Sequence, residues 1–235
     1  MTAELRISDY ELFRVPPRWV FLKIETTNGL TGWGEPIVEG RSKTVATAVE
    51  ELLDTYLLDE NPLRIQEHWQ TMYRGGFYRG GPILMSAIAG IDQALWGIKG
   101  KQYGAPIPEF HGGKVREKIR YYRWVGGDRP ADVGQNASTL VDRGVTAVKM
   151  NATPEFERIE TPKKIKQAGE RLKTVRDAVG EDVKIGVDFH GRVAKSMVPR
   201  VAKELEPYDP MFFEEPVLPE HNDALSEITA TTTVP

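Results

Sequence analysis

The chain has 235 residues, a formal net charge of −3 and no cysteine. This length suffices for one or two domains with a hydrophobic core. The lack of cysteine excludes disulfides, a thiolate nucleophile and a cysteine-ligated zinc site. The small net charge gives no reason to expect binding to nucleic acid or to a membrane surface. No apolar run approaches the roughly 18 residues of a membrane span, and the charged, alternating N-terminus is not typical of a signal peptide. We therefore expect a cytoplasmic enzyme or binding protein.

Residues 4–38 predict an antiparallel sheet. Residues 18–25 alternate between apolar and polar side chains and are rich in strand-forming types. Asn28-Gly29 is a dipeptide preferred in tight hairpin turns, and residues 30–36 provide the returning strand.

Three helices are expected next. Ser42 is a candidate N-cap of the first helix. The second covers residues 64–73. The third has apolar side chains at spacings of three and four across residues 83–99, and Gly104 lies near its expected end.

The segment GGFYRGGP, residues 75–82, separates the second and third helices. It lacks the GKS or GKT ending of a phosphate-binding P-loop, which excludes that function. Two interpretations stay open. A flexible loop with large side chains is suited to cover a binding site, but such a loop more often packs only against its own surroundings.

A repeating strand–helix pattern occupies residues 119–235. The expected strands cover residues 119–125, 145–150, 183–187 and 211–213, with helices between them and a short helix over 221–231. Such alternation without hairpin signals is typical of a parallel α/β sheet. We therefore predict an α+β domain at residues 1–118 and a parallel α/β domain at residues 119–235.

Acidic residues follow the last two of these strands. Asp188 ends one strand, with His190 two residues later, and Glu214 ends the next. The carboxyl ends of parallel strands meet at one edge, where ligands bind. Two adjacent carboxylates repel each other unless a cation compensates, and oxygen ligands suit Mg²⁺. The sequence therefore predicts a magnesium site, although such acids are also ordinary solvated loop residues. Glu215 is not expected to face the same metal, because side chains alternate along a strand.

Several motifs along the whole chain resemble those of the enolase superfamily. They are LTGWGEP (30–36), GGFYRGGP (75–82), GIDQALWGIKGK (90–101), WVGGDRPADV (124–133), VDFHGR (187–192) and FFEEPVLPEH (212–221). The resemblance is to the mandelate racemase and muconate lactonizing group, and within it to galactonate dehydratases and related sugar-acid dehydratases. It implies an α+β capping domain at 1–118. At 119–235 it implies the first half of a (β/α) barrel of the TIM type, with about four of eight strands.

The resemblance also implies roles for individual residues. In the family, acids at the ends of the third and fourth barrel strands hold Mg²⁺, which makes Asp188 and Glu214 the expected metal ligands. Lys149, at the end of the second strand, is expected to pair with the substrate carboxylate and the developing enolate. Asn151 stands where many racemases have a second lysine, so it is expected to bind substrate rather than act as a base. His190 matches the histidine that acts as general acid.

The implied reaction is the Mg²⁺-dependent dehydration of an aldonate, such as D-galactonate, to a 2-keto-3-deoxy acid. The C2 proton is removed, the enediolate is stabilised, and His190 protonates the departing 3-hydroxyl. The family pattern also includes a third metal ligand and a His-Asp pair that acts as base. No residue after Glu214 fits either role, so we expect this chain alone to be weakly active or inactive. A full-length enzyme is expected to form a homo-oligomer.

Other functions stay open. A racemase or cycloisomerase of the same superfamily is one, although the missing second lysine and the Asp188-Phe189-His190 motif count against it. A non-catalytic aldonate-binding or scaffold protein is another. By position alone, His190 is an ordinary loop histidine and Lys149 a surface lysine. The remaining histidines, His68, His111 and His221, receive no role.

Overall fold

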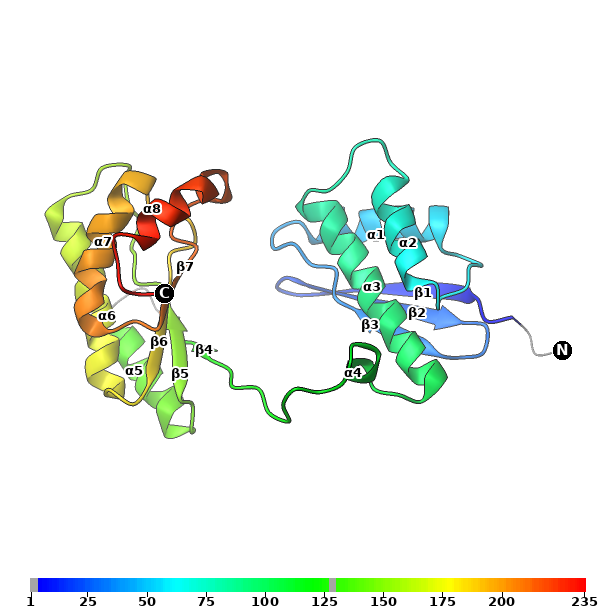
Figure 1. Cartoon of the computed structure of the whole chain (residues 1–235), viewed down its shortest axis with the longest axis horizontal. Helices are drawn as coiled ribbons and strands as arrows, with labels where there is room; N and C mark the ends of the chain where they lie inside the picture. Colours follow the sequence, from blue (N-terminus) through cyan, green and yellow to red (C-terminus); the bar gives the residue numbers. More distant parts are fainter. Residues whose placement is uncertain (1–3, 127–129) are drawn as a thin grey trace. The chain divides into compact units, whose positions relative to one another are not determined.

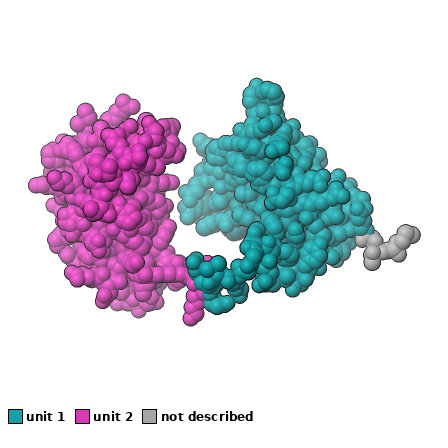
Figure 2. Space-filling model, in the orientation of Figure 1, with its two compact units in different colours: residues 1–117 teal, residues 118–235 magenta. Residues whose placement is uncertain are grey.

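A computed structural model describes residues 4–126 and 130–235 of the chain. The chain divides into two compact units, residues 1–117 and residues 118–235 (Figure 2). Each unit has its own hydrophobic core. Residues 127–129 of the WVGGDRPADV motif lie outside the described residues. In the part of the chain that is described, no helix is long and apolar enough to cross a membrane.

The sheet of the first unit has three antiparallel strands in the order β1-β2-β3. They are β1 (Ile7–Val15), β2 (Trp19–Thr26) and β3 (Thr31–Gly34). Every second side chain of β2, from Val20 to Thr26, is buried, because one face of the sheet lies against helices. The turn predicted at Asn28-Gly29 is confirmed: the Gly29 N–H donates to the Thr26 carbonyl at 2.8 Å.

Helices cover the buried face of this sheet (Figure 1). The helices of this unit are α1 (Ser42–Tyr56), α2 (Ile65–Arg74), α3 (Pro82–Tyr103) and the short α4 (Ile107–Phe110). Of these, α1 and α3 contact the strands, and α2 and α4 pack against other helices. The predicted end of α3 is confirmed, since Gly104 adopts the left-handed conformation with φ of 63°. The predicted N-cap at Ser42 is wrong. The N-cap is Arg41, one residue earlier, because the Arg41 carbonyl already accepts from the Val45 N–H at 3.0 Å, and no side chain caps the helix.

The loop between α2 and α3 exposes its two aromatic residues. Phe77 is 89% exposed and Tyr78 is 87% exposed. Their rings contact each other edge to face, with centroids 5.3 Å apart. These two side chains therefore do not join the core of the first unit. The interpretation of the loop as a lid stays a prediction.

The second unit is built on four parallel strands in the order β4-β5-β6-β7. They are β4 (Arg123–Trp124), β5 (Ala147–Met150), β6 (Lys184–Asp188) and β7 (Phe212–Glu214). The strand predicted at residues 119–125 is wrong in length. Only Arg123 and Trp124 pair with β5, and the preceding segment has no neighbouring strand, which leaves Ile119 78% exposed.

Helices lie along one side of the parallel sheet (Figure 1). The long ones are α5 (Pro130–Asp142), α6 (Pro162–Val179) and α7 (Val198–Leu205). The short elements are the 3₁₀ turns η1 (Lys195–Met197), η2 (Glu206–Tyr208) and η3 (Pro219–Ala224), and helix α8 (Leu225–Thr229). The strand–helix alternation predicted for this part of the chain is confirmed.

Side chains of the parallel sheet alternate between two faces. The face toward the helices carries four fully buried aliphatic residues, Val148, Met150, Ile185 and Val187. Lys149 and Asp188 therefore belong to the opposite face. The register pairs Lys149 with Gly186 and Asp188 with Glu214, so the three charged side chains share one face near the carboxyl edge.

Candidate active site

Three charged side chains meet at this edge of the sheet. The Lys149 ammonium donates to Asp188 Oδ2 at 3.0 Å and to Glu214 Oε2 at 2.9 Å. The side chains of Lys149 and Asp188 are 14% and 3% exposed, and that of Glu214 is 35% exposed. Burial acts to lower the pKa of Lys149, but the hydrogen bonds to Glu214 and Asp188 outweigh burial and hold that pKa above its ordinary value. Lys149 is therefore a charged counter-ion to both carboxylates.

His190 stands at the rim of this cluster, in the turn after β6. Its backbone is left-handed, with φ of 51°, a conformation that needs support from its surroundings in a non-glycine residue. The support comes from the His190 N–H, which donates to Asp188 Oδ1 at 2.8 Å. The ring nitrogen Nε2 lies 3.1 Å from Asp188 Oδ2. The turn thus ties the imidazole to the carboxylate pair.

Asn151 lies beside the other ring nitrogen. Its Nδ2 is 3.2 Å from His190 Nδ1. Its Oδ1 accepts two hydrogen bonds from Thr153, from the backbone N–H and from Oγ1, both at 2.9 Å. Asn151 is 6% exposed and Thr153 is 1% exposed. A chain of contacts therefore runs from Thr153 through Asn151 and His190 to Asp188.

The structure also adds two aromatic residues that the sequence did not indicate. The Lys149 ammonium lies 5.4 Å from the ring centroid of Tyr122 and 5.9 Å from that of Trp124, within the range of a cation–π contact. The Trp124 and His190 ring centroids are 5.8 Å apart. The pairing register of β4 and β5 would have indicated Trp124, because it places Trp124 beside Lys149. Thr153 was missed as well, and no motif marks it.

Residues given no role lie outside the cluster. His68 is buried and its Nε2 lies 2.8 Å from the Asn61 carbonyl. The His111 ring centroid is 4.6 Å from that of Trp96. Glu215 is exposed and does not join the cluster, as predicted.

The carboxylates have the chemistry of a partial magnesium site. Asp188 Oδ2 and Glu214 Oε2 both lie within 3.0 Å of one positively charged atom. Carboxylate oxygens that converge on one cation suit a hard divalent ion such as Mg²⁺. In residues 4–126 and 130–235, no group of three or more His, Cys, Asp or Glu side chains is arranged to hold a metal. The two carboxylates therefore fit two of the ligands that Mg²⁺ requires.

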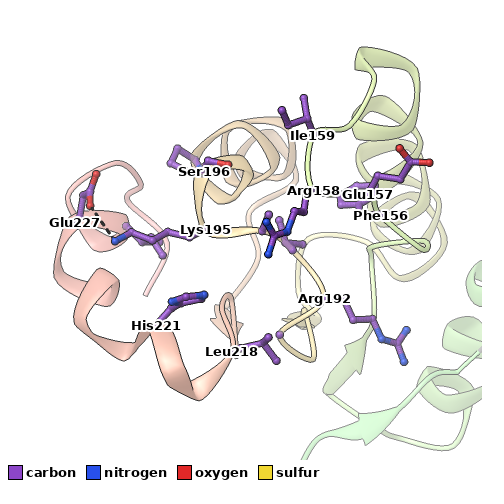
Figure 3. Close-up of a pocket in the computed structure, with 15 residues that line it drawn as sticks. Phe156, Glu157, Arg158, Ile159, Arg192, Lys195, Ser196, Leu218, His221 and Glu227 are labelled. Atoms are coloured by element: carbon purple, nitrogen blue, oxygen red, sulfur yellow. Dashed lines mark ion pairs between the residues drawn. The ribbon is translucent and has the colours of Figure 1, made fainter.

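A separate pocket of about 810 Å³ lies among the loops that follow the strands (Figure 3). Its lining includes Phe156, Arg158, Ile159, Lys195, Leu218 and His221. Lys195 extends toward Glu227, with Nζ 4.0 Å from Oε2. None of the five predicted site residues lines this pocket. We therefore take the cluster around Lys149, and not this pocket, as the candidate active site.

Family comparisons match both units. Residues 15–112 match the N-terminal domain of the mandelate racemase / muconate lactonizing enzyme family, and residues 132–235 match the enolase C-terminal domain-like family. The chain belongs to the enolase superfamily. Both matches place it in the mandelate racemase and muconate lactonizing group of that superfamily, as the sequence motifs predicted. The enolase-like fold is confirmed with them: an α+β capping domain and four parallel strands of a partial (β/α) barrel.

Individual relatives are longer than this chain. D-galactonate dehydratases of Ralstonia pickettii (strain 12J) and Klebsiella pneumoniae (strain 342) are 53% and 52% identical to it over 231 residues. These matches cover 98% of this chain and 60% of each relative. A solved enolase from Pantoea ananatis, with bound D-gluconate and Mg, has a TM-score of 0.86 and 28% identity, over 99% of this chain and 65% of that one.

Proposed function

We propose that this chain carries the metal- and carboxylate-binding part of a sugar-acid dehydratase that acts on D-galactonate or a related aldonate. One observation carries the proposal most directly: Asp188, Glu214 and Lys149 converge at one strand edge with His190 beside them. The relatives named D-galactonate dehydratase, and the Pantoea ananatis structure with D-gluconate and Mg, support the choice of an aldonate.

The difficulty of the reaction explains the need for several positive charges. A proton at C2 of an aldonate is weakly acidic, because its removal places a second negative charge beside the carboxylate. Mg²⁺ bound by Asp188 and Glu214 would supply electrostatic stabilisation of that charge. Lys149 is charged, largely buried and next to the same edge. It is therefore suited to pair with the substrate carboxylate and to stabilise the enediolate as its charge develops.

His190 is suited to the second half of the reaction. The C3–O bond breaks as the electron pair from the C2–H bond forms the C2–C3 double bond. Hydroxide is a poor leaving group, so a proton donated by His190 in its imidazolium form lets it depart as water and leaves a neutral imidazole. General acid catalysis of this kind typically contributes about 10²–10⁴-fold in rate. The resulting enol then gains a proton at C3 to give the 2-keto-3-deoxy acid. The base that removes the C2 proton is not among the five residues of the cluster.

Calorimetry with D-galactonate, with and without Mg²⁺, tests the binding part of this proposal. We expect Mg²⁺-dependent binding that Glu214→Gln weakens at least tenfold, about 1.4 kcal/mol. The matched control is Glu220→Gln, which removes an exposed acid on η3 and should leave binding unchanged. Galactonate binding that ignores Mg²⁺, or equal effects of the two variants, would contradict the metal role of Glu214.

Proton NMR of the same mixtures tests the chemistry. We expect any 2-keto-3-deoxy acid to form only with Mg²⁺ and not in His190→Asn. Exchange of the C2 proton with solvent deuterium, without loss of water, would instead support a racemase. Mg²⁺-dependent binding without either reaction would agree with the absence of a base among the five residues of the cluster.

A further inference from the structure

The pocket among the loops after β5, β6 and β7 has the size of a small-molecule site (Figure 3). Its volume of about 810 Å³ lies within the range of about 300–1,000 Å³ that is typical of such sites. Residues 156–159, 191–196 and 218–228 supply most of its lining. These segments follow strands of the parallel sheet, and ligands of α/β proteins bind beyond the carboxyl ends of the strands.

The walls of this pocket are mostly apolar. Two of the apolar side chains are open to solvent, since Ile159 is 80% exposed and Leu218 is 47% exposed. A ligand with an apolar group would cover them, and removal of this surface from water favours binding. A polyhydroxy acid lacks such a group, so the pocket is not suited to a second aldonate. The apolar lining includes Phe156, Ile159, Val193, Ala194, Leu218 and Ile228.

One positive charge faces these apolar walls without a counter-ion. Figure 3 shows the Arg158 side chain directed into the pocket, whereas those of Glu157 and Arg192 extend away from it. Lys195 has Glu227 as its neighbour, with Nζ 4.0 Å from Oε2. In the part of the chain that the structure describes, no hydrogen bond or ion pair engages the Arg158 guanidinium. The pocket therefore combines one free guanidinium with an apolar lining.

This combination defines the class of ligand. A guanidinium is planar and binds a carboxylate through two parallel hydrogen bonds. One free positive charge balances one negative charge, so a monocarboxylate fits better than a doubly charged phosphate ester. We propose that this pocket binds a small monocarboxylate with an apolar group, with the carboxylate on Arg158 and the apolar group against Ile159 and Leu218. The site is separate from the cluster around Lys149, and it does not depend on the proposed dehydratase function.

NMR of the arginine side chains tests the proposal, in samples with neither Mg²⁺ nor an aldonate. Phenylacetate is the probe, because it joins one carboxylate to an aromatic ring. Two analogues separate these features: phenylacetamide has the ring without the charge, and acetate has the charge without the ring. The readout is the ¹H–¹⁵N signal of Arg158 Nε, identified as the signal that is lost in Arg158→Gln. The signals of the other arginines report non-specific binding of the anion.

We expect phenylacetate to shift the Arg158 signal in a saturable way, with a dissociation constant in the millimolar range that suits so small a ligand. Each analogue should bind about tenfold more weakly, since each lacks one of the two contacts. Ile159→Asn should weaken phenylacetate binding about fivefold, because it removes an apolar wall. The matched control is Ile119→Asn, which changes an isoleucine that is 78% exposed and outside the pocket, and should leave binding unchanged.

Four results would overturn the proposal. They are no shift of the Arg158 signal, a shift shared equally by the other arginines, equal affinity for either analogue, and equal effects of the two isoleucine variants. Both isoleucines are exposed, so neither change should prevent folding. None of these results depends on turnover, on Mg²⁺ or on an aldonate, so a failure here is distinct from a failure of the dehydratase proposal.

Discussion

The two units bury different kinds of side chain. Among the described residues, the buried polar side chains of the first unit are Thr26 and His68. Those of the second unit are Asn151, Thr153, Glu160, Arg171 and Asp188. Burial of a polar group is costly unless a partner satisfies it. The buried side chains of the first unit are therefore almost all apolar, whereas the second unit retains more buried polar groups, three of them at the carboxyl edge of its sheet. The candidate active site lies in the unit that buries these polar groups.

Close packing in the first unit depends on glycines where β3 meets α3. A Cβ atom added to Gly34 would lie 1.8 Å from the Gly90 carbonyl oxygen, and one added to Gly32 would lie 1.9 Å from the Ala94 carbonyl oxygen. Both obstacles are backbone atoms, which cannot rotate away as a side chain does. The strand and the helix are therefore held at a distance that only glycine permits.

The largest expected effect comes from Gly34→Ala. The added methyl must push β3 away from α3, so the free energy of unfolding of the first unit should fall by about 3 kcal/mol or more. Tryptophan fluorescence in denaturant is a suitable measurement, because four of the five tryptophans lie in this unit. The control is Gly97→Ala on the same helix, where the nearest atom is 3.7 Å away. Because alanine favours a helix interior more than glycine does, that change should raise the free energy of unfolding by about 0.5–1 kcal/mol. Similar losses in both variants would refute the packing explanation.

Lys149→Met should produce the next largest effect, in the second unit. It leaves two carboxylates together without a cation, and removal of one partner from a buried ion pair costs about 3–5 kcal/mol. Glu214 is one-third exposed, so we expect a smaller loss, about 2 kcal/mol in the free energy of unfolding, measured by thermal denaturation without metal. Mg²⁺ should stabilise this variant more than the wild type, because the metal no longer displaces an ammonium group.

Lys173→Met provides the comparison for that measurement. Lys173 pairs with Asp177 on the exposed surface of α6, with side chains 52% and 61% exposed. Its loss should cost less than about 0.5 kcal/mol and leave the response to Mg²⁺ unchanged. If Mg²⁺ raised the melting temperature of wild type and Lys149→Met by the same amount, Lys149 would not occupy the place of the metal.

Local sequence patterns predicted which strand ends carry the charged residues of the candidate site, but not the contacts that these residues make with one another. Strand ends at Lys149, Asp188 and Glu214 follow from runs of apolar residues, and the parallel order brings such ends to one edge. Glu215 does point away from the cluster as predicted, but the reason differs from strand alternation, because β7 ends at Glu214 and Glu215 has a left-handed backbone with φ of 46°. These features depend on residues within one element and its immediate neighbours in the chain.

The missed features depend on residues that are far apart in sequence or on backbone geometry. Lys149 bonds to acids 39 and 65 positions away, and no local pattern reveals that both share one ammonium. The strand at 119–125 contains strand-forming residues, but only Arg123 and Trp124 find a partner strand. The N-cap position of α1 was missed because it depends on the backbone conformation at Arg41, which makes Ser42 the first helical residue.

Acid sensitivity should belong to the second unit, through Glu160. Its carboxylate accepts from the Thr161 N–H at 2.8 Å and from the Glu157 N–H at 3.1 Å. These backbone hydrogen bonds lower the pKa of Glu160 from 4.5 to about 2. A lowered pKa stabilises the fold above pH 4.5, and the stabilisation is lost as pH falls toward 2. Melting temperatures between pH 2 and 6 should therefore fall less steeply in Glu160→Gln. The exposed Glu181→Gln serves as control, and a slope equal to that of wild type in Glu160→Gln would contradict the assignment.

Alkaline sensitivity should belong to the first unit, through Tyr10, and is the smallest effect. The Tyr10 hydroxyl donates to Asp54 Oδ1 at 2.8 Å. Burial, followed by the hydrogen bond and charge of Asp54, raises the pKa of Tyr10 to about 12. A raised pKa stabilises the fold below pH 10, and the stabilisation is lost as pH rises toward 12.

Tyr10→Phe should remove the tyrosinate absorbance step near pH 12 and cost about 0.5–1 kcal/mol at neutral pH, the net value of one hydrogen bond. Tyr103→Phe, at a position 61% exposed, should leave that step in place. If the step near pH 12 survived in Tyr10→Phe, the contact with Asp54 would not explain it. Among its described residues, the first unit would then have no titratable group whose pKa is shifted as strongly as that of Glu160 in the second unit.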